Sequence, residues 1–177
     1  AGICSAITPA GGGLASIDCV KAVMLETVAA KLRERGEHVD VVEMEHEVLA
    51  TVLAKKNLTL GDLGLKGCTL IYRRSVRDMP IAAFKDGADD ASKLKTMDTR
   101  EKLIRLVQEK FLCGFRGNVL PKELVLDAAG NVCGIKVVTT RIEGRKVIEL
   151  PGTEEVLPTR LVVSSIDDST ITLSDSK

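Results

Sequence analysis

The sequence predicts an α/β domain in which a parallel sheet flanked by helices is joined to an antiparallel β-meander. Three observations predict it. A short apolar segment, Ile3–Thr8, leads through three glycines into a long amphipathic run over 14–35. A second apolar and β-rich run, 68–72, follows further along the chain. The last third then changes to short strand candidates separated by turn-forming residues.

Composition bounds the class of protein. The 177 residues, 45% of them hydrophobic, fit a single domain over 1–177. Twenty-five basic residues balance 25 acidic ones and aromatic residues are only 2%, so no nucleic-acid partner is indicated. No apolar run approaches the roughly 20 residues that span a bilayer, and no signal peptide is visible. We therefore expect a cytoplasmic protein without membrane insertion.

The five cysteines and two histidines give no metal motif. The cysteines are widely spread, without a C-x-x-C pair, and neither His38 nor His46 has the spacing of a metal ligand. Reduced thiols in a cytosolic protein are the expectation.

Local patterns predict the first two thirds element by element. Apolar residues at helical spacing predict a helix over 14–35 that ends at Gly36. Further along, the patterns predict an extended segment over 39–44, a helix over 45–56, a turn over 59–63 capped by Thr59, a strand over 68–72 entered at Gly67, and a loop over 78–95. Asp98 and Glu101 resemble a capping box, which predicts a helix from there to near Lys110.

The last third reads as β structure. Five strands are predicted, over 111–116, 123–127, 132–140, 145–150 and 161–166. The middle three are joined so closely that they must run antiparallel, as a meander over about 118–160. The last strand is apolar enough to lie buried in a parallel sheet. The tail over 167–177 has no assigned role.

The glycine triplet is the strongest functional signal. Gly11 and Gly13 allow the tight turn and the close backbone approach that a pyrophosphate needs, and the helix that follows presents unpaired N–H groups. A strand, a glycine turn and a helix in this order predict a Rossmann-like nucleotide site. Ser16 stands where such a site usually has its third glycine, a substitution that often accompanies NADP.

Several motifs together resemble one family. The stretch 11–18 resembles the G-G-G-x-x-A-x-D signature of the second nucleotide-binding domain in the glutamate synthase small (β) subunit and related pyridine nucleotide-disulfide, FAD-dependent oxidoreductases; adrenodoxin reductase is more distant. The stretch 68–80, CTLIYRRSVRDMP, is similar to the family's second-strand motif, and 121–166 is similar to its closing meander and final S-I strand.

This resemblance implies an inserted NAD(P)H-binding domain of three-layer ββα type. Hydride would pass from NADPH to FAD held by a separate FAD-binding domain of the same parent chain, with an electron-transfer partner beyond it. The implied NADP(H)-binding residues are Gly11, Gly12, Gly13, Leu14, Ala15, Ser16, Asp18, Arg73 and Arg74. Asp18 would lie near the nicotinamide end, and Arg73 and Arg74 would meet the 2′-phosphate. No catalytic residue and no metal ligand is implied in this chain.

Alternatives remain open at this point. If 39–44 were the second strand, Glu43 or Glu45 would lie near the adenosine ribose, which would favour NAD. A module that senses NAD(H), or an interaction domain without catalysis, would use the same glycine turn. Three departures from the family pattern stand out: Pro9 directly before the glycines, the tail, and a helical insertion over about 37–66.

Overall fold

The structure, a computed structural model, describes residues 3–8 and 13–165, with side chains over 13–165. The helices are α1 (Leu14–Glu34), α2 (Val41–His46), α3 (Leu49–Ala54) and α4 (Asp90–Phe111), with a 3₁₀ turn, η1 (Val76–Asp78). The strands are β1 (Ile3–Thr8), β2 (Leu65–Ile71), β3 (Gly114–Arg116), β4 (Val119–Leu126), β5 (Val132–Glu143), β6 (Lys146–Glu149), β7 (Glu155–Pro158) and β8 (Leu161–Ser164).

Four strands form a parallel sheet in the order β3-β2-β1-β8. β1 lies inside it and pairs in parallel with β2 on one side and with β8 on the other. The predicted strands at 3–8 and 161–166 are therefore neighbours, although 152 residues of the chain lie between Thr8 and Leu161. β8 is an edge strand with Leu161 exposed, which corrects the prediction that it would be buried.

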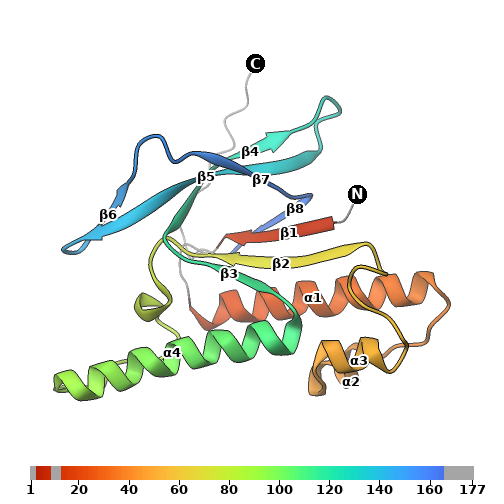
Figure 1. Cartoon of the computed structure of the whole chain (residues 1–177), viewed down its shortest axis with the longest axis horizontal. Helices are drawn as coiled ribbons and strands as arrows, with labels where there is room; N and C mark the ends of the chain where they lie inside the picture. Colours follow the sequence, from red (N-terminus) through yellow and green to blue (C-terminus); the bar gives the residue numbers. More distant parts are fainter. Residues whose placement is uncertain (1–2, 9–12, 166–177) are drawn as a thin grey trace.

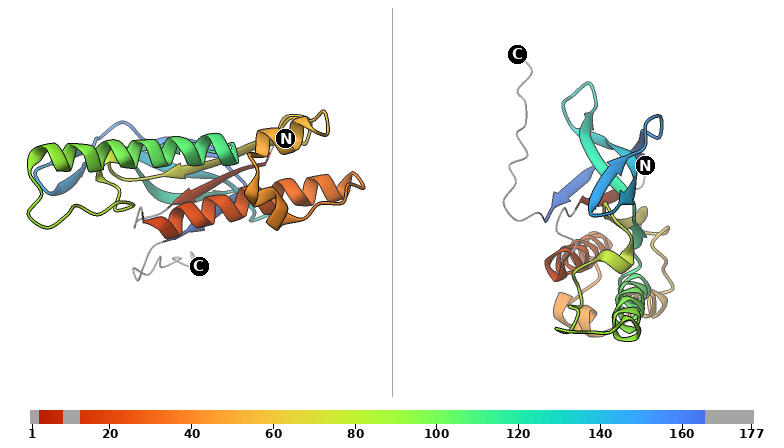
Figure 2. Two further views of the ribbon diagram at one scale, coloured as in Figure 1. Left: turned by 90° about the horizontal axis from the view of Figure 1, so that it is seen from below. Right: turned by 90° about the vertical axis from the view of Figure 1, so that its left-hand side faces the viewer.

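Three layers make up the domain. Figure 1 shows the helices on one face of the parallel sheet and the antiparallel strands on the other, and the right-hand view of Figure 2 shows the same stacking end on. The predicted ββα arrangement of a Rossmann-like sheet and a meander is confirmed.

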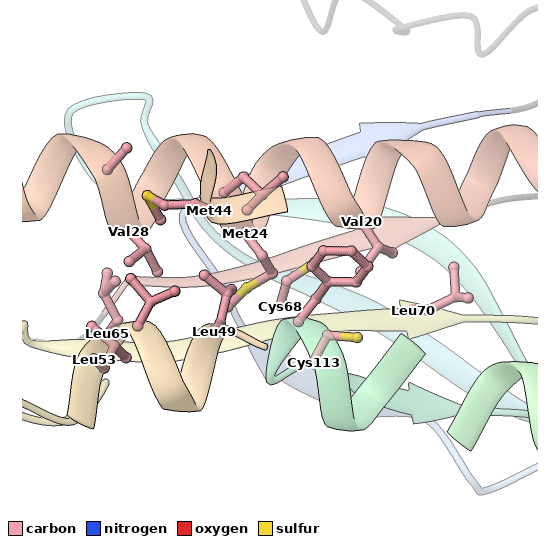
Figure 3. Close-up of a cluster of buried hydrophobic side chains, with 14 of the residues drawn as sticks. Val20, Met24, Val28, Met44, Leu49, Leu53, Leu65, Cys68, Leu70 and Cys113 are labelled. Atoms are coloured by element: carbon pink, nitrogen blue, oxygen red, sulfur yellow. The ribbon is translucent and has the colours of Figure 1, made fainter. Parts of the chain in front are cut away.

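The core between helices and sheet is aliphatic. α1 contributes Val20, Met24 and Val28 at helical spacing, and β2 contributes alternate residues, Cys68 and Leu70, from the facing surface (Figure 3). α1 ends where predicted, since Gly36 takes φ +81° and the N–H groups of Gly36 and Glu37 bond to carbonyls of the last turn.

The second core joins the two sheets. Ile71 points from β2 away from the helices and packs with Val119, Ile135 and Val137 of the meander. β5 is the central strand of that layer and pairs antiparallel with β4, β6 and β7. β7 is a strand that the sequence analysis missed.

The structure differs from the prediction for the segment 39–56. Residues 41–44, expected within the extended segment 39–44, belong to the helix α2, because Asp40 caps the helix by accepting from the Val42 N–H at 2.8 Å and Met44 is buried against the core. The helix predicted over 45–56 is divided, since residues 45 and 46 end α2 and α3 begins at Leu49 after a break at Glu47 and Val48.

The start of α4 also differs from the prediction. The helix begins at Asp90, eight residues before Asp98, because Asp89 accepts from the Ser92 N–H at 2.8 Å. Residues 90–95 are thus helical and not loop, and Asp98 and Glu101 cap nothing. The end of the helix, at Phe111, lies one residue beyond the prediction.

Gly67 lies inside β2 and not before it. It takes φ +82°, at a bulge where the register against β1 shifts, and a Cβ on it would lie 2.9 Å from the Leu112 carbonyl oxygen. Gly67 therefore allows the end of α4 to approach the sheet.

We predict that Gly67→Ala destabilises the domain more than Gly36→Ala does. The two glycines share nearly the same φ, but nothing lies within 4 Å of a Cβ at Gly36. The common left-handed backbone should cost about 1–2 kcal/mol in each variant, and the clash at Gly67 should add roughly 1–3 kcal/mol. Urea unfolding measures both, and equal losses would contradict this account of Gly67.

Candidate functional site

The candidate site lies at the carboxyl edge of the parallel sheet. The chain leaves β1 toward β2 and β3 on one side and returns to β8 on the other, so the strand order reverses beside β1. Ligands of open α/β sheets bind outside the carboxyl ends of the strands at such a reversal. α1 begins at this same edge, six residues after Thr8 (Figure 1).

The first turn of α1 suits an anion. Its N-cap is Gly13, so no side chain caps the turn, and the turn contains no acidic residue. Nothing lies within 4 Å of a Cβ at Gly13, and Leu14 and Ala15 are exposed. The open backbone and the positive helix end fit a pyrophosphate. Gly11 and Gly12 lie outside the described residues, and so does Pro9.

Ser16 ties α1 to the end of β8. It is 1% exposed, and its Oγ lies 2.9 Å from the Oγ of Ser165. A side chain at this third-glycine position therefore fills the contact between helix and sheet and adds a hydrogen bond to it. The two sides of the strand reversal are joined by this pair of hydroxyls.

Asp18 lies one turn further along α1, with its side chain 69% exposed. Its carboxylate is 3.3 Å from the Lys21 ammonium, which also donates to Glu45 of α2 at 3.0 Å. Both hydrogen bonds raise the pKa of Lys21, the one to Glu45 most. The role of Asp18 beside the nicotinamide stays a prediction.

The NAD alternative is wrong in its geometry. It required 39–44 to be the strand beside β1, but that place belongs to β2, and Glu43 and Glu45 lie on the helix α2. The residues that leave the carboxyl end of β2 are instead Tyr72, Arg73 and Arg74, as the second-strand motif predicts.

The two arginines differ. The Arg74 guanidinium donates to the Arg145 carbonyl at 3.1 Å, in the turn between β5 and β6. The exposed Arg73 guanidinium makes no hydrogen bond or ion pair within 13–165. Arg73 is thus the cation available to a ligand at the end of β2.

Tyr72 is buried beneath the arginines. Its hydroxyl donates to the Asp78 carbonyl at 3.3 Å, and burial raises its pKa, although the nearby cations of Arg74 and Arg73 oppose that shift. The phenol therefore stays neutral and holds the start of the following segment against the core.

The segment after the arginines is fastened to α4, which the sequence analysis missed. The Arg77 guanidinium bonds to Glu101 at 2.6 Å and to Asp98 at 3.3 Å. Arg100, 5% exposed, donates to the carbonyls of Arg77 and Ala82 and lies 4.4 Å from the centre of the Phe84 ring. Asp98 and Glu101 thus serve as acceptors for the loop, and only their helical spacing of three could have suggested it.

Other kinds of site find no support in the described part of the chain. Residues 13–165 contain no cluster of His, Cys, Asp and Glu that could hold a metal ion. No helix there has the length and apolarity needed to cross a bilayer.

Comparisons with known proteins show the fold of this chain but not its family. No family model matches the chain, and no curated protein matches it. Among solved structures, FprA of Mycobacterium tuberculosis in complex with NADPH matches over 93% of this chain, with 17% identity and a TM-score of 0.52. A second FprA structure, which revealed a covalent modification of NADP⁺, matches over 93% with 18% identity and a TM-score of 0.47.

The chain spans 38% of the length of either FprA chain. At such identities the likeness shows the fold, and the resemblance to the glutamate synthase subunit stays a prediction.

We predict that Arg100→Met loosens the segment that follows the arginines. Methionine keeps an apolar stem but leaves the carbonyls of Arg77 and Ala82 without these donors. A local loss of about 1.4 kcal/mol would raise the open population about tenfold, so trypsin should cut at Lys85 about tenfold faster. Arg105→Met, an exposed change on the same helix, is the control, and equal cleavage rates would contradict the clamp.

We predict that the thiols differ in reactivity. Burial raises the pKa of the Cys113 thiol to about 11, whereas Cys133 is exposed. Iodoacetamide at pH 8 should alkylate Cys133 and spare Cys113 until urea unfolds the chain, as mass spectrometry of peptides would show. Because the unfolded thiol ionises first, Cys113 should also lower stability as the pH rises toward 11. Equal labelling in the folded chain would contradict this.

Proposed function

We propose that the chain is the NADP(H)-binding domain of a flavin-dependent oxidoreductase. The observation that carries the proposal is the placement of an exposed Arg73 and its neighbour Arg74 at the carboxyl end of β2, beside the strand that leads to α1. In a dinucleotide-binding sheet this position faces the adenosine ribose, where arginine binds a 2′-phosphate and a carboxylate binds a free 2′-OH.

The residues present fit the nucleotide. The uncapped first turn of α1 at Gly13 would hold the pyrophosphate, and Arg73 would donate to the 2′-phosphate with a fork-shaped pair of N–H groups. No acidic residue stands among the six that directly follow β2, residues 72–77, whereas three of those six are arginines. The first carboxylate after the strand, that of Asp78, accepts from the Ser75 hydroxyl at 2.6 Å.

The FprA structure in complex with NADPH has the same fold over 93% of this chain, which supports the same class of ligand here. Bound NADPH would supply a hydride from its C4, and FAD held outside this chain, in a separate FAD-binding domain, would accept the two electrons and the proton at N5. The protein's part in such a transfer is to orient the nicotinamide. This chain is then one part of the enzyme, and alone it binds the nucleotide without turnover.

We predict that the 177-residue chain binds NADPH more tightly than NADH, and that Arg73→Ala removes this preference. Each hydrogen bond to a charged group contributes roughly 1.5–3 kcal/mol, so the Kd for NADPH should rise about 10- to 100-fold while the Kd for NADH stays within twofold. Isothermal titration calorimetry with both nucleotides measures this.

The control is Arg33→Ala, which removes the same charge from the last turn of α1, about 30 Å from the first. It should leave both affinities unchanged. Equal affinity for the two nucleotides in the unmodified chain, or binding of neither, would overturn the NADP(H) assignment.

A further inference from the structure

The backbone that carries the two arginines is held by the antiparallel layer. The Thr140 hydroxyl donates to the Arg73 carbonyl at 2.8 Å, and the Asn118 N–H donates to the Arg74 carbonyl at 2.9 Å. Both donors belong to the meander side of the domain, Thr140 to β5 and Asn118 to the turn before β4. Two successive peptide groups after β2 are thus fixed from the opposite sheet.

Thr140 is a polar residue in an apolar place. It is 3% exposed, and Val137 and Val138, just before it on β5, are buried as well. Its N–H donates to the Asn118 carbonyl at 2.8 Å, which leaves the hydroxyl for Arg73. Burial of a hydroxyl is unfavourable unless it is hydrogen-bonded, so this contact accounts for a threonine where valine would otherwise fit.

The chain packs closely around the same point. A Cβ on Gly117 would lie 2.9 Å from the Arg74 carbonyl oxygen, so this glycine allows the turn to reach the arginine segment. Arg74 adds a third link through its own guanidinium, which donates to the Arg145 carbonyl. Because that acceptor is a neutral carbonyl, this hydrogen bond does not offset the positive charge of Arg74 beside Arg73.

We propose that Thr140 is a positioning residue that determines selectivity for the 2′-phosphate by fixing the backbone of Arg73. The proposal rests on the proposed NADP(H) function. Arg73 has no side-chain partner within 13–165 to orient it, so the direction in which its guanidinium leaves the chain is set by its backbone. Without the Thr140 hydroxyl the Arg73–Arg74 peptide can rotate, and ordering the arginine on the phosphate costs more.

The test compares three variants by calorimetry with NADPH and with NADH. Thr140→Val keeps the shape of the side chain and removes its hydroxyl. Loss of the hydrogen bond that fixes the Arg73 carbonyl should raise the Kd for NADPH about fivefold and leave the Kd for NADH within twofold. Thr140→Ser keeps the hydroxyl and should restore the affinity for NADPH. Thr139→Val is the matched control, since it is the same change on the neighbouring residue of β5, and it should change neither Kd.

The outcomes separate the two proposals. A wild-type chain without preference for NADPH overturns the proposed function and this inference with it. A wild type that prefers NADPH, together with a Thr140→Val chain that keeps the full preference or weakens both nucleotides equally, overturns this inference alone. If Thr140→Val fails to fold, Thr140→Cys tests the same contact, because a buried thiol is only a weak donor.

Discussion

The stretch from Tyr72 to Arg74 hydrogen-bonds to both layers of β structure, and the rest of the domain is arranged around it. The Tyr72 N–H donates to Arg116 of β3, while the Tyr72 carbonyl accepts from Val119 of β4. The same residue buries its ring on the helical side. One short stretch thus ends the parallel pairing and begins the contact with the meander, so the two sheets cannot shift independently at this edge.

This junction explains how the candidate binding edge is held in place although it is built from loops that follow the ends of strands. Loops at the carboxyl edge of a sheet usually make few contacts and are more mobile than the strands that they connect. Here the arginine segment is bonded to the meander on one side, and the residues that follow it are bonded to α4 through Arg77 and Arg100 on the other. The antiparallel layer is therefore more than a cover for the sheet, because it holds the backbone that presents the arginines.

The sequence predicted the elements whose signals are local. The stop of α1 at Gly36, the core of β2 and the meander all carry periodicity or turn chemistry that the structure confirms. The failures have a common cause. α2 is a six-residue helix containing two valines, which favours extended structure by propensity, and only the Asp40 cap and the burial of Met44 decide otherwise. β7 begins at Glu155, directly after Glu154, and exists through its pairing with β5.

The sequence predicts which residues form the candidate site but not the different contacts that each of them makes. In the sequence, nothing distinguishes Arg73 from Arg74. The spacing of Asp98 and Glu101 resembles a capping box and does not indicate that both carboxylates are ion-pair partners of Arg77. The chain bends at Arg73 and Arg74, and only the Arg74 guanidinium reaches a protein acceptor, the Arg145 carbonyl, while Arg73 is exposed to solvent. Which one does so depends on where the β5–β6 turn lies, a long-range fact that no local pattern contains.

This difference between the two arginines has an electrostatic consequence. A guanidinium bound to a neutral carbonyl adds its charge to the edge without a counter-ion, whereas one bound to a carboxylate would cancel it. Arg74 therefore raises the potential at the end of β2 while Arg73 keeps its donors for a ligand. A dianionic phosphate benefits from both terms and a free hydroxyl from neither, so the arrangement favours the phosphorylated ribose by geometry and by charge at once.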